Sequence, residues 1–239
     1  MHFSIIMRGR NCQDYIKKSL KCLINQTYTN WSATIILDAP EDDSYKIAKK
    51  IVKDDDRFKL FKNKKRMGVA YNMWYGVKRS NATNGDVIAW YDADDELPPK
   101  SLKIVSKVYK KNPKIALTYG SFWRLDKKKK TKTSRPLKKN VPVRRQKWHL
   151  SHLKTCKYEL FQHLPIDCLK DSWGNWFQAA SDVATMVPLS ELAGPDRCQH
   201  VPEITYLWNM TKHKTKGHMQ KRAKDEIYKK TPLKRLEVI

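Results

Sequence analysis

The sequence predicts an α/β protein whose central, mostly parallel sheet is covered by helices on both faces. Short runs of consecutive apolar residues alternate, along the first half of the chain, with segments of helical periodicity. Strands and helices that alternate in this way form βαβ units, which place successive strands parallel. The chain has 239 residues, enough for one large domain with a continuous hydrophobic core.

The first strand is expected at residues 3–7, and it leads into the polar loop 8–11. A helix follows, because apolar side chains then recur at helical spacing and share one face. These side chains are Ile16, Leu20, Leu23 and Ile24. The polar sequence Asn-Gln-Thr-Tyr at 25–28 is expected to end this helix.

The second strand is expected at residues 31–37, which are rich in β-branched side chains and end at Asp38. A polar turn covers 39–44, and the next helix contains Ile47, Ile51 and Val52. A shorter third strand covers 58–61. After a break at Met67 and Gly68, residues 69–77 have the pattern of a third helix.

The fourth strand, residues 87–90, runs directly into three clustered carboxylates: Asp92, Asp94 and Asp95. A hard cation such as Mg²⁺ or Mn²⁺ compensates such repulsion, usually while it also holds phosphate oxygens of a substrate. In open α/β sheets the ligand crevice lies beyond the carboxyl ends of the strands, where these residues emerge. The alternative interpretation is a solvated acidic turn, helped by Pro98 and Pro99.

The order of elements and several local sequences resemble family 2 glycosyltransferases of the GT-A fold, a Rossmann-like architecture. The matching sequences are Ser-Ile-Ile at 4–6, Leu-Ile-Asn-Gln-Thr-Tyr-Thr-Asn-Trp at 23–31, Ile-Ile-Leu-Asp at 35–38, Gly-Val-Ala-Tyr-Asn at 68–72 and the Asp-x-Asp of 91–95. The resemblance is strong over residues 3 to about 100 and looser to about 210. It implies a single domain, 1–239, with a nucleotide-sugar-binding half (about 1–100) and an acceptor-side half (about 101–239).

Two departures from the family pattern fall where the nucleotide base would lie. The first loop of the family often carries Pro-Thr-Tyr-Asn, whereas residues 7–11 read Met-Arg-Gly-Arg-Asn. The second strand usually ends in two adjacent aspartates, whereas here Asp38 precedes Ala39. The preferred base is therefore left open, with UDP favoured.

By this resemblance, the chain is a metal-dependent glycosyltransferase that uses a nucleotide-diphosphate sugar and Mn²⁺ or Mg²⁺. Asp94, with help from Asp92, would hold the ion, which stabilises the negative charge that grows on the departing diphosphate. Asp92 would also reach the ribose, and Asp38 the base. Further candidates for the nucleotide are Asn72, which would brace the pocket, and Arg66, Arg8 and Arg10, since a guanidinium offers a planar fork of donors.

Asp182 is the candidate general base in the second half, where it precedes the apolar run 183–188. The resemblance implies that its carboxylate takes the proton of the acceptor hydroxyl, with inversion at the sugar carbon. The alternative is a helix N-cap. Trp173 and Trp176 would form a platform for a sugar ring, or pack in the core. Glu191, the nearest rival base, is interpreted as structural.

Four residues between 149 and 163 raise the question of a zinc site: His149, His152, Cys156 and His163. They lack the usual paired cysteines, which disfavours structural zinc. The segment 148–155 resembles a recurring segment of some family 2 enzymes, in which the histidine at the place of His152 lies near the donor diphosphate or the metal. The alternative for His152 is a structural histidine.

The formal net charge is +25, from 49 basic and 24 acidic residues. Much of the excess lies in the basic segment, residues 126–147, where 126–142 has little apolar periodicity and predicts a mobile loop. Such charge attracts polyanions, so the segment would serve as a lid over the diphosphate or as a contact to an anionic membrane that bears a glycan or lipid-linked acceptor. A solvated surface without a partner is the alternative.

Two other functions remain open: a basic nucleic-acid-binding protein and an inactive relative that only binds nucleotide sugars. Zinc-finger, helix-turn-helix and RNP-type signatures are missing from the sequence, which disfavours specific nucleic-acid binding. No apolar run reaches the length of a membrane span. The five cysteines are odd in number and scattered, which favours reduced thiols and a cytoplasmic protein, peripheral to a membrane at most.

Overall fold

The computed structural model describes residues 1–130, 134–210 and 217–238. The strands are β1 (Phe3–Gly9), β2 (Trp31–Leu37), β3 (Phe58–Lys62), β4 (Val87–Asp92), β5 (Leu117–Arg124), β6 (Lys129–Lys130), β7 (Lys154–Lys157) and β8 (Cys198–Trp208). The helices are α1 (Gln13–Ile24), α2 (Ser44–Val52), α3 (Val69–Arg79), α4 (Ser101–Lys111), α5 (Tyr158–Gln162), α6 (Ser181–Ala193) and α7 (Gly217–Lys229), with short 3-10 turns η1 (Val143–Arg145), η2 (Ile166–Leu169) and η3 (Pro195–Arg197).

The strands form one sheet in the order β3-β2-β1-β4-β7-β5-β6, and β8 pairs with β5. Strands β1 to β4 are parallel to one another, as the alternation of strands and helices predicted. β7 enters antiparallel between β4 and β5, whereas β5 and β8 are parallel. The predicted mostly parallel sheet is therefore confirmed.

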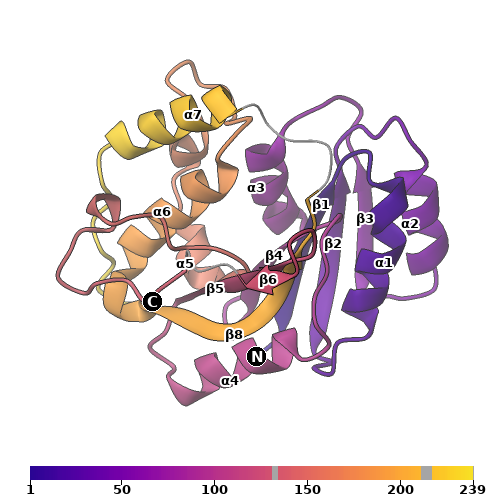
Figure 1. Ribbon diagram of the computed structural model, residues 1–239, viewed down its shortest axis with the longest axis horizontal. Coiled ribbons are helices and arrows are strands. Elements are labelled where there is room, and N and C mark those ends of the chain that lie inside the picture. The colour runs from indigo at the N-terminus through magenta and orange to yellow at the C-terminus, as the bar shows by residue number, and fades with distance from the viewer. Residues whose placement is uncertain (131–133, 211–216, 239) are drawn as a thin grey trace.

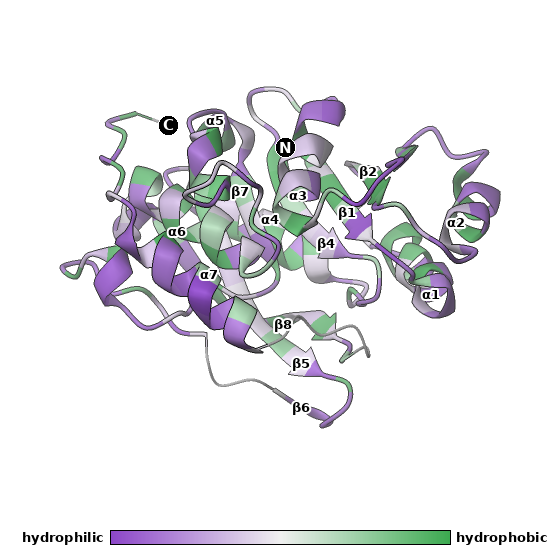
Figure 2. Ribbon diagram, turned by 90° about the horizontal axis from the view of Figure 1, so that it is seen from above, coloured by the Kyte–Doolittle hydropathy of each residue, from purple (hydrophilic) through white to green (hydrophobic). Residues whose placement is uncertain are grey.

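Helices cover both faces of the sheet (Figure 1). Side chains alternate along β1: Ile5 packs with residues of α1, α2 and α4, and Ile6 packs with residues of α3 and α6 on the other face. In Figure 2 the strands and the inward helix faces carry most of the green, hydrophobic segments, while α7 is largely purple. No helix within the described ranges combines the length and the apolarity that crossing a bilayer requires.

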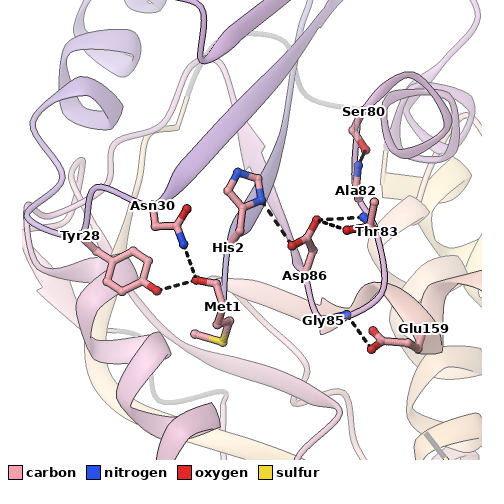
Figure 3. Close-up of polar contacts among 10 residues, drawn as sticks. All are labelled: Met1, His2, Tyr28, Asn30, Ser80, Ala82, Thr83, Gly85, Asp86 and Glu159. Carbon is pink, nitrogen blue, oxygen red and sulfur yellow. Dashed lines mark hydrogen bonds and ion pairs between the residues drawn. The ribbon is translucent and has the colours of Figure 1, made fainter.

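Polar contacts tie down the amino-terminal ends of β1 and β4 (Figure 3). His2 Nδ1 lies 3.6 Å from a carboxylate oxygen of Asp86, and the other oxygen accepts a 2.8 Å hydrogen bond from the backbone N–H of Thr83. Tyr28 donates a 2.6 Å hydrogen bond to the carbonyl of Met1. These contacts lie at the amino-terminal end of the parallel strands, opposite to their carboxyl ends.

The basic segment is partly anchored in the core. Residues 131–133 lie outside the described residues, but beyond them Leu137 and Val143 are buried in the core. Tyr119 Oη donates to the carbonyl of Arg135 and accepts from the N–H of Leu137, both at 2.9 Å. Residues 134–142 form a loop, as predicted, but buried apolar side chains spaced among the lysines attach this part of the chain to the core. The mobility of the segment remains a prediction.

Arg144, in the same segment, forms a buried ion pair with Glu191 of α6. The Nε–Oε1 distance is 2.5 Å, and the side chains are 9 % and 6 % exposed. The second carboxylate oxygen of Glu191 accepts hydrogen bonds from Arg144 at 3.0 Å and from the N–H of Leu233 at 3.1 Å. The interpretation of Glu191 as a structural residue is therefore confirmed.

Replacing Glu191 with Ala is expected to destabilise the protein by about 3–5 kcal/mol, because Arg144 would remain as a buried, unpaired charge. Urea unfolding monitored by circular dichroism measures this change. Glu203→Ala, at an exposed glutamate of β8, is the control and should change stability by less than about 0.5 kcal/mol. Equal effects of the two substitutions would show that the ion pair is not structural.

Candidate active site

A cleft of about 1220 Å³ lies at the carboxyl ends of the parallel strands β1, β2 and β4. Most of the sequence-predicted site residues line it: Arg8, Arg10, Asp38, Arg66, Asn72, Asp92, Asp94, His152 and Asp182. They come from β1, β4, α3 and α6 and from the loops next to β1, β2, β4, α3 and β7. Trp173 and Trp176 are not among the lining residues. The fold thus brings together side chains from both halves of the chain.

The close approach of β1 and β4 builds the centre of the cleft. Arg8 and Asp92 occupy matched register positions on these parallel strands. Arg8 Nη2 lies 2.8 Å from Asp92 Oδ1. The N–H of Ala93 donates a 2.8 Å hydrogen bond to the carbonyl of Arg8. Gly9 follows Arg8 at the end of β1, and a Cβ there would lie only 2.6 Å from the Cβ of Ala93, so this position needs glycine.

The three clustered carboxylates have different roles. Asp95 is buried, and its oxygens accept hydrogen bonds from Tyr206 Oη at 2.6 Å and from the N–H of Asn209 at 2.7 Å. Burial raises the pKa of the Asp95 carboxyl well above its ordinary value, and the charges of Asp92 and Asp94 add to the rise. Asp95 therefore fastens the turn to β8, while Asp92 and Asp94 line the cleft only partly buried.

The oxygens of two carboxylates are suitable ligands for a hard divalent cation. Such a cation binds proteins through one or two carboxylates and completes its coordination with waters and substrate phosphates. Asp92 ends β4 and Asp94 follows two residues later, so both face the cleft from one turn. Over the described ranges, no three His, Cys, Asp or Glu side chains are grouped so that they could hold a metal ion. This applies to His149, His152, Cys156 and His163, which form no zinc cluster.

Asp38 organises the side of the cleft that leads into α3. Its carboxylate accepts hydrogen bonds from the backbone N–H groups of Met67 and Gly68, both at 2.9 Å, and from the Asn63 amide at 2.7 Å. The same Asn63 amide donates to Asn72 at 2.8 Å. Gly68 has φ +90°, a conformation that favours glycine. Asp38 and Asn72 thus hold the loop that borders the predicted nucleotide pocket.

The two other predicted arginines lie at the rim. Arg10, just after β1, forms a 2.8 Å ion pair with the exposed Glu41, which lies in the loop after β2. Arg66 is exposed and lines the cleft from the loop before α3. Both side chains are therefore placed where a ligand in the cleft would meet them.

His152 lies beside the carboxylate turn, between aromatic rings. Its ring stacks on Tyr206 with centroids 4.3 Å apart and meets Phe122 edge-on at 5.7 Å. Burial lowers the pKa of His152 well below its ordinary value, and the cations of Lys154 and Arg8 lower it further. The imidazole is therefore neutral at pH 7, and its buried Nδ1 has no hydrogen-bond partner.

Lys154 of β7 lines the cleft with its side chain buried, and sequence reasoning missed it. Its ammonium lies 3.4 Å from His152 Nε2. Burial lowers the pKa of Lys154, although the carboxylates of Asp182 and Asp92 oppose the shift. The residue is one of 49 basic residues, and no local pattern distinguished it. Only the pairing of β7 with β4 places it inside.

Asp182 is the second residue of α6, and its side chain lines the cleft. The N-cap position belongs to Ala180, with φ +51°, and no side chain caps the helix. The alternative interpretation of Asp182 as an N-cap is therefore wrong. A carboxylate in the first turn is favoured by the helix dipole. Because α6 is almost entirely buried, it holds this carboxylate rigidly.

Trp173 and Trp176 lie outside the cleft. Trp173 is 67 % exposed, with the guanidinium of Arg222 5.0 Å from its ring. Trp176 packs against Tyr71 of α3, with ring centroids 5.2 Å apart. Their proposed contact with a sugar remains a prediction. Two other tryptophans, Trp148 and Trp208, line the cleft and were not singled out from the sequence.

Comparison with known proteins agrees with this architecture. Residues 4–172 match the model of glycosyl transferase family 2. WfgD of Escherichia coli, a UDP-Glc:alpha-D-GlcNAc-diphosphoundecaprenol beta-1,3-glucosyltransferase, is 30 % identical over 121 residues, which are 50 % of this chain and 45 % of WfgD. This chain spans between about a third and a half of the length of the first curated relatives that it matches.

Solved structures show the fold. S. aureus TarS 1-349 in complex with UDP-GlcNAc superposes with a TM-score of 0.68 at 15 % identity, over 92 % of this chain and 60 % of that one. The mannosyltransferase PcManGT from Pyrobaculum calidifontis, in complex with GDP-Man and Mn²⁺, has a TM-score of 0.63 at 16 % identity, over 88 % and 57 %. The predicted GT-A fold is thus confirmed, and because the family model matches more than half of the chain, this protein belongs to glycosyl transferase family 2.

Proposed function

We propose that this protein is a metal-dependent, inverting glycosyltransferase that moves a sugar from a nucleotide-diphosphate sugar to a hydroxyl group of a glycan or lipid-linked acceptor. One observation carries the proposal: the cleft unites Asp92 and Asp94 at the end of β4 with Asp182, a carboxylate from α6 about ninety residues later in the chain. An acidic pair for a cation and a separate base are the groups that such a transfer needs.

In the proposed mechanism, the acceptor oxygen attacks the anomeric carbon as the bond to the diphosphate breaks. The bonding electrons go to the bridging oxygen of the diphosphate, and Asp182 takes the proton of the acceptor hydroxyl. Asp92 and Asp94 would hold Mn²⁺ or Mg²⁺, which supplies Lewis-acid stabilisation of the leaving group when bound. Attack opposite the leaving group inverts the sugar carbon without a covalent enzyme intermediate.

The nucleotide would lie along β1, β2 and α3, the half that covers residues 1–100. Asp38 and Asn72 shape this side of the cleft, while Arg8, Arg10 and Arg66 offer guanidinium donors to the phosphates or the base edge. His152, neutral and next to Lys154, would lie near the diphosphate. The acceptor would approach from the half that covers residues 101–239, where Asp182 faces the cleft.

The donor and acceptor are proposed from relatives. WfgD is named for a UDP-linked glucose and a lipid-diphosphate acceptor, and the TarS structure holds UDP-GlcNAc, so we infer a UDP-sugar donor and a lipid-linked acceptor. The charge of +25 would favour peripheral contact with an anionic membrane on the cytoplasmic side.

A thermal-shift screen with UDP and GDP, each with and without Mn²⁺, tests the proposal. At one hundred times Kd a ligand stabilises a protein by about 2.7 kcal/mol, which raises Tm by roughly 5–10 °C in a domain of this size. We expect this rise for a nucleoside diphosphate only together with Mn²⁺. Donor hydrolysis measured on the same samples separates an active enzyme from an inactive nucleotide-binding relative.

The same thermal-shift assay distinguishes a glycosyltransferase from a nucleic-acid-binding protein. Stabilisation by arbitrary duplex DNA, with an affinity that falls steeply with salt, would favour that alternative. No stabilisation by any nucleoside diphosphate with metal would contradict the glycosyltransferase proposal.

A further inference from the structure

Asp92, a proposed metal ligand, forms an ion pair with the positively charged side chain of Arg8. The two side chains lie on adjacent parallel strands in matched register, 2.8 Å apart between Nη2 and Oδ1. They are only 15 % and 21 % exposed, so solvent screens the pair poorly. A divalent ion that binds Asp92 through this oxygen competes with the guanidinium for it.

Arg8 is at the same time poorly satisfied where it lies. It lies 2.8 Å from Asp92 Oδ1 through Nη2, but its buried Nε has no hydrogen-bond partner. A guanidinium binds most strongly as a planar fork, with two parallel hydrogen bonds to a carboxylate or phosphate. Arg8 therefore keeps donor capacity that an anionic ligand in the cleft could use.

The surroundings of Arg8 favour an incoming anion. Lys154 and His152 line the same cleft, and Arg8 is close enough to act electrostatically on both. Two basic side chains, Arg8 and Lys154, and a neutral imidazole with a buried, unpartnered Nδ1 thus line the part of the cleft that holds Asp92. Phosphate oxygens would accept from these donors and would offset the repulsion between Arg8 and Lys154.

We propose that Arg8 is a positioning residue that occupies Asp92 in the donor-free protein and moves to the phosphates when a nucleoside diphosphate enters, which frees Asp92 for a divalent ion. This inference rests on the proposed function for the identity of its ligand. It predicts that the metal alone binds weakly, and that the nucleotide and the metal strengthen each other's binding by the same factor.

The test compares Mn²⁺ binding by the wild type and Arg8→Met, measured by electron paramagnetic resonance of the free ion, with and without UDP. In the Mn²⁺-only measurement Arg10→Met is the matched control: Arg10 lies two residues further along the chain and its 2.8 Å ion pair is with Glu41, so this substitution removes one positive charge and leaves the Arg8–Asp92 pair in place. The effect of UDP is compared with the wild type instead, because Arg10 is itself a proposed nucleotide-binding residue. Arg8→Lys keeps a cation beside Asp92.

We expect Arg8→Met to bind Mn²⁺ alone at least fivefold more tightly than Arg10→Met does. The factor by which UDP strengthens Mn²⁺ binding should fall at least fivefold in Arg8→Met, and Arg8→Lys should stay close to the wild type. Asp94→Ala in the Arg8→Met background should remove the gain, which shows that the measured site is the one in the cleft. Circular dichroism confirms that each variant is folded.

Mn²⁺ binding by Arg8→Met that is unchanged, weaker or undetectable relative to Arg10→Met overturns the inference. The Mn²⁺-only comparison does not depend on sugar transfer. If Arg8→Met gains affinity for Mn²⁺ but no donor sugar is transferred or hydrolysed, the inference about Arg8 stands and the proposed function fails.

Discussion

Replacing Asp182 with Asn should lower the rate of sugar transfer by about 10²- to 10⁴-fold, the range that general-base catalysis contributes. The amide keeps the shape of the side chain but cannot take up the proton of the acceptor hydroxyl. Because Asp182 is carried by the rigid, buried helix α6, the substitution should leave the fold unchanged. Steady-state kinetics with a UDP-sugar donor and Mn²⁺ measures the effect.

The loss should appear in kcat, while the affinity for UDP with Mn²⁺ should stay within about twofold of the wild type. Asp225→Asn, at an exposed aspartate of α7, is the control for a change of net charge and should retain full activity. Transfer by Asp182→Asn at more than a tenth of the wild-type rate would rule out Asp182 as the base.

Asp94→Asn is expected to remove the metal-dependent part of nucleotide binding and to lower transfer at least 100-fold. The amide keeps one neutral oxygen where a hard cation needs anionic oxygen, and the Lewis-acid contribution is worth several kcal/mol. The Tm of the variant with UDP and Mn²⁺ should fall to the value found with UDP alone. Differential scanning fluorimetry and donor turnover measure the two effects.

Asp54→Asn, at an exposed aspartate after α2, provides the comparison for loss of one negative charge. It should keep the Mn²⁺-dependent rise in Tm. If Asp94→Asn keeps this rise as well, then Asp94 does not hold the ion, and the proposed assignment of the acidic pair is wrong.

Much of the first hundred residues could be predicted because local patterns specify it. The apolar run at 31–37 became β2 with the expected bounds, and the periodic segment at 69–77 became α3, which continues to Arg79. A buried strand needs consecutive apolar residues and a surface helix needs one apolar face, so both leave a trace in the sequence. The apolar run at 87–90 likewise became part of β4, so the carboxylates that follow it lie at the carboxyl end of this strand.

The second half was harder to predict because its elements depend on distant partners. β7 is only four residues long and contains two lysines, and β8 mixes buried and exposed positions along its length. Short or polar strands become stable when neighbouring strands pair with them, and periodicity alone does not show this. The burial of Leu137 and Val143 in the basic segment could not be predicted, because the few apolar side chains of this segment form no sustained helical or strand pattern.

By itself, the sequence determined the α/β class, the parallel strands and the acidic turn at the end of β4, since each follows from patterns within a few residues. Only the tertiary structure decided how the cleft is assembled. The register of β1 against β4 places Arg8 beside Asp92. A hydrogen bond from Tyr206 of β8 holds Asp95 and gives it a different role from the other two carboxylates. The packing of β7 and α6 brings Lys154 and Asp182 into the cleft. Those contacts join residues that are far apart in the chain, and sheet pairing and core packing create them only when the whole domain folds.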